Sequence, residues 1–343
     1  MKHLKELREI VKTIIKKAKE ENKKSMFSIA TTSNINNRNI LFPSIRETDK
    51  TICGNILLTS DKYLKEIIKE IDGIVEIILV DAETKVLNIT NLELKVRNIV
   101  KESKIFTFRP NDLTVDAADA LIAQTKYPLK DKKVTIIGGG NIGSKLALKL
   151  VERGANIYLT RKNERKLKKI SGGLNTIKSD YLKSKIYYTT QNLRAAENAD
   201  ILIGTTPGIA AITKEMICKI KGSCIIIDIG NGTIFPDAIE EAKKRKIKIF
   251  CLSMKPGYDG ALETIFQTEE FIKRQKSRNL ENFSIISGGI LGKRGDIIID
   301  NVDKPTKIIA IADGKGDTIP YLNSKEFQKN IQTVKKLIKG EIK

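Results

Sequence analysis

The stretch VTIIGGGNIG, residues 134–143, decides the fold expected for this chain of 343 residues. Gly138, Gly140 and Gly143 have the G-x-G-x-x-G spacing. In that pattern the first glycine allows a tight turn, the second lets the backbone approach a diphosphate, and the third lets a helix pack on a strand. A helical pattern and a second strand-like run, residues 156–160, follow. The stretch therefore predicts a βαβ unit that binds a dinucleotide at the N-terminus of its helix, with a ligand-free glycine-rich turn as the alternative.

The residues after the second strand distinguish between the two nicotinamide dinucleotides. A site for NAD carries an acidic residue there, which binds the ribose 2′-OH, whereas this chain has Thr160, Arg161 and Lys162. The planar guanidinium of Arg161 can bind a 2′-phosphate, which a carboxylate would repel. We therefore expect NADP(H) as the cofactor. The alternative is that Arg161 and Lys162 are solvated loop charges.

Length and composition bound the class of protein. The chain is long enough for two ordinary domains with buried cores, and a hydrophobic content of 41% is typical of a globular protein. No apolar run approaches the roughly 18 residues that a transmembrane helix needs. The apolar residues near the N-terminus follow helical spacing among lysines and glutamates, unlike those of a signal or transit peptide. We therefore expect a cytoplasmic location.

The formal charge of +21 raises the alternative of a basic protein that binds nucleic acid or an anionic membrane. The lysines, however, are spread over the whole chain and mixed with 41 acidic residues. They do not gather with aromatic residues on one segment. We therefore expect neither nucleic acid nor a membrane as a partner, and keep membrane binding through the amphipathic residues 1–20 as an alternative.

Histidine and cysteine usage excludes several chemistries. The only histidine is His3, in an expected surface helix, so a histidine base, a Ser-His-Asp triad or a histidine-rich metal cluster cannot form in the core. Proton transfer must then depend on Lys, Tyr, Asp, Glu or Cys. The four cysteines lack C-x-x-C spacing, so we expect reduced thiols and no metal site. Cys53, near polar loop residues, remains open as a nucleophile.

The order of expected elements divides the chain into three parts, all within an α/β fold. Residues 1–112 form a small αβ domain, and residues 113–275 contain a connecting helix and a doubly wound Rossmann domain. Residues 276–343 form an extension with β-structure and a terminal helix, which packs on the first domain or on a partner subunit. The first domain has expected strands at 26–32, 75–81 and 104–108 and helices at 62–71 and 92–101.

Ligands bind at the carboxyl ends of the strands in a doubly wound sheet. The glycine loop, residues 205–208 and residues 230–232 follow such strands, so they share one edge of the expected sheet. The residues expected to contact the cofactor are Gly138, Gly139, Gly140, Asn141, Ile142, Gly143, Thr160, Arg161, Lys162, Thr205, Thr206, Pro207, Gly230 and Asn231.

Three local stretches resemble the family of two-domain dehydrogenases that includes shikimate dehydrogenase and the methylene-tetrahydrofolate and methylene-tetrahydromethanopterin dehydrogenases. Residues 114–118 are similar to the start of that family's connecting helix, and residues 159–165 to its NADP-binding Asn-Arg-Thr-x-x-Arg pattern. Residues 259–267 resemble the shikimate-enzyme segment whose glutamine contacts the substrate. The resemblance covers roughly residues 26–275 and implies a substrate cleft between a small αβ domain and the Rossmann domain.

The resemblance also implies an acid/base pair, a lysine after the second strand and an aspartate directly after the threonine of the connecting helix. Here Val115 follows Thr114, and Asp116 comes one position later. Lys85 stands at the lysine position, although its neighbours differ from the shikimate motif. We hypothesise that Lys85 is a proton donor or electrostatic partner, assisted by Asp116, with Gln267 orienting the substrate. The alternative is that Lys85 is one solvated lysine among many.

We therefore expect an NADP-dependent oxidoreductase, a homo-oligomer, that transfers a hydride between nicotinamide and a small substrate. A cyclic hydroxy acid, a pterin and an imine all remain open as that substrate, as does the direction of reaction. The alternatives are a non-catalytic NADP-binding regulatory protein and the basic surface-binding protein described above.

Overall fold

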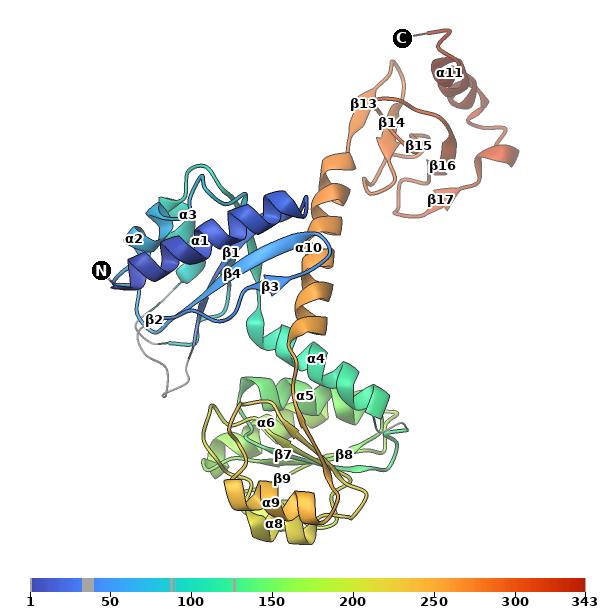
Figure 1. The fold of residues 1–343 in the computed structure, drawn as a ribbon. Helices are drawn as coiled ribbons and strands as arrows, with labels where there is room; N and C mark the ends of the chain where they lie inside the picture. Colours follow the sequence, from blue (N-terminus) through green and yellow to red (C-terminus); the bar gives the residue numbers. More distant parts are fainter. Residues whose placement is uncertain (1, 33–39, 87–88, 90, 126–127, 343) are drawn as a thin grey trace. The chain divides into compact units, whose positions relative to one another are not determined.

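The computed structural model describes residues 2–32, 40–86, 89, 91–125 and 128–342. The chain divides into two compact units, Met1–Ala261 and Leu262–Lys343. The first unit contains two separate β-sheets, and the second contains one. Both units are mixed α/β structures, as the order of elements predicts (Figure 1).

The first sheet is built from the N-terminal part of the chain. Its strand order is β2-β4-β1-β5-β6, with β3 also paired to β4, and β1 lies parallel to both β4 and β5. Helices α1, α2 and α3 supply apolar side chains to its core. The bounds are α1 Lys2–Glu20, β1 Lys24–Thr31, β2 Ile40–Leu41, β3 Arg46–Glu47, β4 Thr51–Leu58, α2 Leu64–Lys69, β5 Ile77–Asp81, α3 Leu92–Ile99 and β6 Lys104–Phe108.

The apolar face of α1 belongs to this core. Leu7 and Ile14 are 0% exposed, and Val11 is buried with them. In this fold that face packs against the protein's own sheet. The structure also has no helix, among the residues it describes, with the length and apolar character of a membrane span.

Strand β4 was not predicted, and it changes the interpretation of Cys53. The strand pairs with β1 over its whole length, from Lys24 opposite Thr51 to Thr31 opposite Leu58. Cys53 lies within it and is completely buried, so its expected place among polar loop residues is wrong. Burial raises the pKa of the Cys53 thiol to about 11. Because the thiolate is the nucleophile, this thiol is suited to packing rather than to covalent chemistry.

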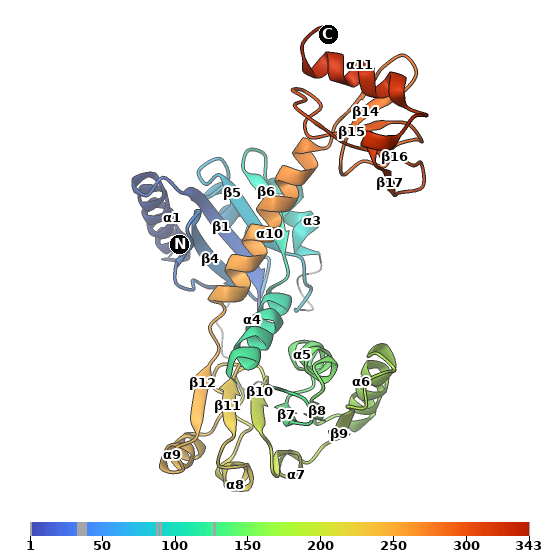
Figure 2. The same cartoon turned by 90° about the vertical axis from the view of Figure 1, so that its right-hand side faces the viewer.

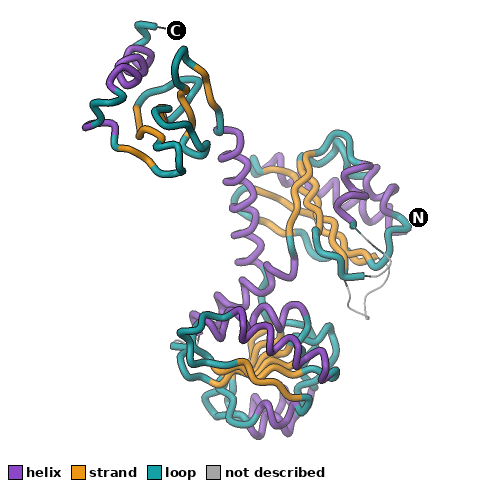
Figure 3. Tube along the Cα trace, turned by 180° about the vertical axis from the view of Figure 1, so that it is seen from behind, coloured by secondary structure: helices purple, strands orange, loops and turns teal. Residues whose placement is uncertain are grey.

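The second sheet is the doubly wound sheet that the glycine loop predicts. Its strand order is β12-β11-β10-β7-β8-β9 with every pair parallel, so the order reverses between β7 and β10. Helices α4, α5 and α6 contribute to the core on one face, and α7, α8 and α9 to the core on the other (Figures 1 and 3). The bounds are β7 Lys133–Ile137, α5 Asn141–Glu152, β8 Asn156–Thr160, α6 Glu164–Ile177, β9 Ile186–Thr189, α7 Asn192–Ala196, β10 Ile201–Gly204, α8 Lys214–Lys219, β11 Ile225–Asp228, α9 Pro236–Lys244 and β12 Lys248–Cys251.

Asp200, directly before the first residue of β10, has a structural role at the end of the sheet where the strands begin. Burial raises the pKa of Asp200, but the N–H of Lys133 and the ammonium of Lys221 donate to its carboxylate and outweigh that effect. The pKa of Asp200 therefore lies below its usual value. The ionised carboxylate joins β7 to β10.

The connecting helix is α4, Pro110–Thr125, and most of the residues along one side of it are buried. Val115, Ala118 and Ile122 pack into the same core as α5. The long helix α10, Lys255–Arg274, follows β12 and contains the boundary between the two units (Figure 2).

The second unit has the β-structure and terminal helix that the sequence predicts. Its strands have the order β13-β14-β15-β16-β17, and the isoleucines of β14, β15 and β16 pack with α11. The bounds are β13 Ser277–Asn279, β14 Ser284–Ser287, β15 Ile297–Ile299, β16 Ile308–Ala312, β17 Thr318–Ile319, η1 Tyr321–Asn323 and α11 Gln328–Ile338. Its role as a contact for the first domain or for a partner subunit stays a prediction.

Candidate active site

The glycine loop joins β7 to α5 in a turn that glycine alone fits easily. Gly138 has a φ of +117°, a conformation that L side chains rarely adopt. The N–H groups of Gly138 and Gly139 both donate to the carbonyl of Thr160, at 3.2 and 2.6 Å. The loop is therefore tied to the carboxyl end of β8.

The other two glycines of the motif have contrasting surroundings. A Cβ atom on Gly143 would lie 2.2 Å from the carbonyl oxygen of Gly138, so the helix can approach the strand only without a side chain there. A Cβ atom on Gly140, the N-cap of α5, would meet nothing within 4 Å. Open space therefore lies over the N-terminus of α5, whose first N–H groups have no intrahelical partners and favour an anion. These residues fit a diphosphate.

Arg161 lies beside this loop, directly after β8. Its Nη1 donates to the carbonyl of Gly139 at 2.6 Å, while Lys162 next to it is exposed. Both cationic groups therefore follow the strand whose last residue, Thr160, anchors the glycine loop. The position is that of a ribose-binding residue in a dinucleotide site.

The loops after β10 and β11 pack closely against the glycine loop and against each other. Thr205 Oγ1 donates to the carbonyl of Gly138 at 2.6 Å. A Cβ atom on Gly230 would lie 1.8 Å from the carbonyl oxygen of Thr206, so only glycine permits this approach. Asn231 has a φ of +56°, and its exposed amide lies 3.7 Å from Cys251 Sγ.

A cavity of about 480 Å³ joins these loops to the first sheet. It brings together seven of the residues predicted to contact the cofactor, as well as Lys85. Lys85 is the one charged side chain among the described residues that line it. The lining residues are Thr31, Thr32, Leu57, Thr84, Lys85, Pro110, Asn111, Thr114, Gly140, Asn141, Ile142, Thr205, Thr206, Pro207, Ile229 and Gly230.

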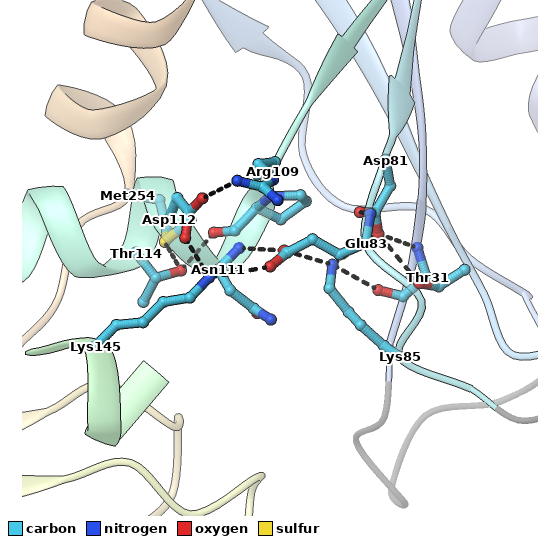
Figure 4. Close-up of polar contacts among 11 residues, drawn as sticks. Thr31, Asp81, Glu83, Lys85, Arg109, Asn111, Asp112, Thr114, Lys145 and Met254 are labelled. Atoms are coloured by element: carbon cyan, nitrogen blue, oxygen red, sulfur yellow. Dashed lines mark hydrogen bonds and ion pairs between the residues drawn. The ribbon is translucent and has the colours of Figure 1, made fainter. Parts of the chain in front are cut away.

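Lys85 is held by a carboxylate that the sequence analysis did not consider. Its Nζ lies 2.7 Å from Asp81 Oδ2 and 3.7 Å from Glu83 Oε2. The side chain of Asp81 is 0% exposed and that of Lys85 is 13% exposed (Figure 4). Lys85 is thus a partly buried, paired ammonium, and not a solvated surface lysine.

Glu83 connects Lys85 to the connecting helix and to α5. Its Oε2 accepts the N–H of Asn111 at 2.8 Å, and its Oε1 lies 3.6 Å from Lys145 Nζ. Lys145 also pairs with Asp112 (Figure 4). One partly buried carboxylate therefore contacts residues of both sheet-bearing parts of the first unit.

The structure places the other two predicted catalytic residues in different contacts. Asp116 is 55% exposed and pairs with Lys149 Nζ at 3.0 Å, whereas Thr114, two positions earlier, lines the cavity. Gln267 belongs to the second unit, where its Nε2 donates to Glu263 at 2.8 Å. The roles of both residues stay predictions.

Asp81 and Glu83 are the site residues that sequence reasoning missed. The signal was present as Asp-x-Glu-x-Lys beginning at the last residue of an apolar strand, which puts two carboxylates within four residues of Lys85. Among the residues that the structure describes, no three acidic, histidine or cysteine side chains gather as a metal site would need.

Comparisons with known proteins agree with this nucleotide-binding geometry. Residues 133–232 match a family described as "NADP oxidoreductase coenzyme F420-dependent". Alanine dehydrogenase 2 of Staphylococcus aureus is 32% identical over an alignment of 114 residues that covers 30% of this chain. The chain matches only 28% of the length of that curated relative. Residues 133–232, which include the glycine loop and β8, are therefore similar to a domain of NADP-dependent oxidoreductases.

Two solved structures show a weak likeness to this chain. A shikimate dehydrogenase in complex with NADP+ is 15% identical, with 72% of this chain and 90% of that chain covered and a TM-score of 0.42. The 5-ketofructose reductase of a Gluconobacter species is 12% identical, with 66% and 87% covered and a TM-score of 0.39. Both TM-scores lie below 0.5, and neither likeness carries a function for this chain.

Proposed function

We propose that this protein is an NADP-dependent oxidoreductase that transfers a hydride between nicotinamide and a small polar substrate bound beside Lys85. One observation carries the proposal. The same cavity is lined by Gly140, at the N-terminus of α5, and by Lys85, after β5. A cofactor bound on the glycine loop can therefore extend toward the Lys85 ammonium.

The chain's residues hold the cofactor in this proposal. The open space over Gly140 takes the diphosphate, and Arg161 takes the 2′-phosphate of NADP. Because no carboxylate follows β8 at Thr160, Arg161 and Lys162, the 2′-OH of NAD lacks its usual partner. The bound nicotinamide supplies or accepts the hydride.

Lys85 is the proton donor in this proposal. Its ammonium can donate to a developing alkoxide or amine, or polarise a carbonyl, in a chain whose single histidine lies in α1. The hydroxyls of Thr31 and Thr114 and the amide of Asn111 also line the cavity and can orient a polar substrate. A cyclic hydroxy acid, a reduced pterin and an imine all fit this chemistry.

The test is Lys85→Met, with Lys69→Met on the exposed surface of α2 as the matched control. NADPH oxidation and NADP+ reduction are screened against the three substrate classes. We expect Lys85→Met to lower turnover by about 10²-fold or more with NADP+ affinity unchanged, and Lys69→Met to behave as wild type.

Two results would refute the proposal. Turnover of Lys85→Met near the wild-type value would remove Lys85 from the mechanism. NADP+ binding without turnover of any substrate class would favour a regulatory protein instead.

A further inference from the structure

The carboxylate of Asp81 accepts hydrogen bonds from four donors. Its Oδ2 accepts the N–H of Thr31 at 3.0 Å and the Thr31 hydroxyl at 3.1 Å, and its Oδ1 accepts the N–H of Glu83 at 2.8 Å. The Lys85 ammonium is the fourth donor, at 2.7 Å from Oδ2. Backbone N–H and ammonium groups can only donate, so Asp81 is held as an acceptor on both oxygens.

The position of Asp81 is fixed by the pairing of two β-strands and does not depend on the conformation of a loop. Asp81 is the last residue of β5, and Thr31 is the last residue of the neighbouring parallel strand β1. The register pairs Ile29 with Val80, which brings the two strand ends together. The carboxylate is therefore a rigid anchor, whereas Lys85 is a long side chain on the following connection.

The inference rests on the proposed function of Lys85. We propose that Asp81 is the positioning residue that holds the Lys85 ammonium in the cavity for proton transfer, in place of Asp116. Asp81 is buried and touches Lys85, whereas Asp116 is exposed and touches Lys149. Glu83 is further away, at 3.7 Å from the ammonium, and also accepts the N–H of Asn111 and pairs with Lys145.

The primary test measures Lys85 itself and needs no substrate. Wild-type protein and Asp81→Asn are treated at one fixed pH with trinitrobenzenesulfonate, and labelling of Lys85 is quantified by peptide mass spectrometry against exposed Lys69. Loss of the carboxylate removes the contact that holds the Lys85 side chain in the cavity and lets it move toward solvent, so we expect Lys85 labelling to rise about tenfold or more. The control is Asp119→Asn, which removes the partner of Arg153 and should leave Lys85 labelling unchanged.

Kinetics separate positioning from a general structural effect. We expect Asp81→Asn to lower kcat about tenfold or more while KM and the Kd for NADP+ stay within about twofold. In a Lys85→Met background, Asp81→Asn should lower kcat no further, because its effect passes through the lysine. If Asp81→Asn does not fold, Asp81→Ser replaces it, since serine also lacks the carboxylate that contacts Lys85 and should likewise raise Lys85 labelling.

The outcomes distinguish this inference from the proposed function. Unchanged Lys85 labelling in folded Asp81→Asn or Asp81→Ser overturns the inference, even in an active enzyme. A rise in Lys85 labelling in Asp116→Asn instead would also overturn it. A rise in Asp81→Asn, in a protein that turns over no substrate, supports the Asp81 contact and refutes the proposed function alone.

Discussion

Replacement of Gly140 by alanine should separate nucleotide binding from folding. Gly140 has φ −92° and ψ −159°, which alanine can adopt, and a Cβ atom there would meet nothing within 4 Å. A compatible Gly→Ala change usually leaves stability unchanged or raises it by about 0.4–1 kcal/mol. The free energy of unfolding of Gly140→Ala should therefore not fall.

The same methyl group would stand in the space assigned to the diphosphate. It would displace the phosphate oxygens from the N–H groups at the start of α5, and a hydrogen bond to a charged group contributes about 1.5–3 kcal/mol. Loss of one such bond corresponds to a Kd for NADP+ about 10- to 100-fold higher. Isothermal titration calorimetry measures that change, and thermal unfolding checks the fold.

Two further glycines serve as controls. Gly143→Ala forces a Cβ atom to 2.2 Å from a backbone oxygen, so it should lower both stability, by about 1–3 kcal/mol, and NADP+ affinity. Gly173→Ala in the exposed part of α6 should leave NADP+ affinity unchanged and raise the free energy of unfolding by about 0.5–1 kcal/mol. A folded Gly140→Ala that binds NADP+ as tightly as wild type would refute a diphosphate site at this turn.

Three other predictions follow from charges and burial. Arg161→Ala should weaken NADP+ binding about tenfold or more and NAD+ binding little, and equal weakening of both in calorimetry would contradict a 2′-phosphate contact. Iodoacetamide at neutral pH should label exposed Cys218 and Cys251 in native protein but not Cys53, whose pKa burial raises to about 11; mass spectrometry of the labelled peptides checks this. The pKa of Asp200 is lower in the folded state, so its contribution to stability is complete above about pH 5 and is lost as the pH falls through the folded value. Asp200→Asn should therefore cost about 1–3 kcal/mol at pH 7 and less at pH 3, and urea unfolding at both values would show equal losses if this were wrong.

The Rossmann part was predictable because its signals are local. The glycine loop fixes one turn, and the apolar runs on either side fix β7 and β8 to within a residue of their observed ends. Parallel strands of such a sheet are buried on both faces, so they are nearly continuous in apolar residues and easily recognised. The carboxyl-end loops then follow from the topology of the sheet.

Strand β4 was missed because its sequence, TICGNILL, places glycine and asparagine in mid-strand. Both residues have reasons that lie far away in the sequence. A Cβ atom on Gly54 would lie 2.4 Å from Cδ1 of Ile14 in α1, so the helix packs where a side chain would stand. The Asn55 amide donates to Ser44 O at 2.7 Å and accepts from Ser28 Oγ at 2.7 Å. Tertiary contacts therefore override strand propensity at these positions.

The partner of Lys85 depends on helix phase and strand register, which sequence spacing alone does not convey. Thr114 lines the cavity, and Asp116, two residues later on α4, lies about 200° further around the helix. An aspartate directly after Thr114 would lie only about 100° away, so the one-residue displacement turns Asp116 toward Lys149 instead. Asp81 reaches Lys85 because four residues along the connection bring the chain back over the end of β5. A carboxylate on a strand end is held more rigidly than one on a helix surface, and for that reason the Asp81–Lys85 pair is the better candidate for the catalytic centre.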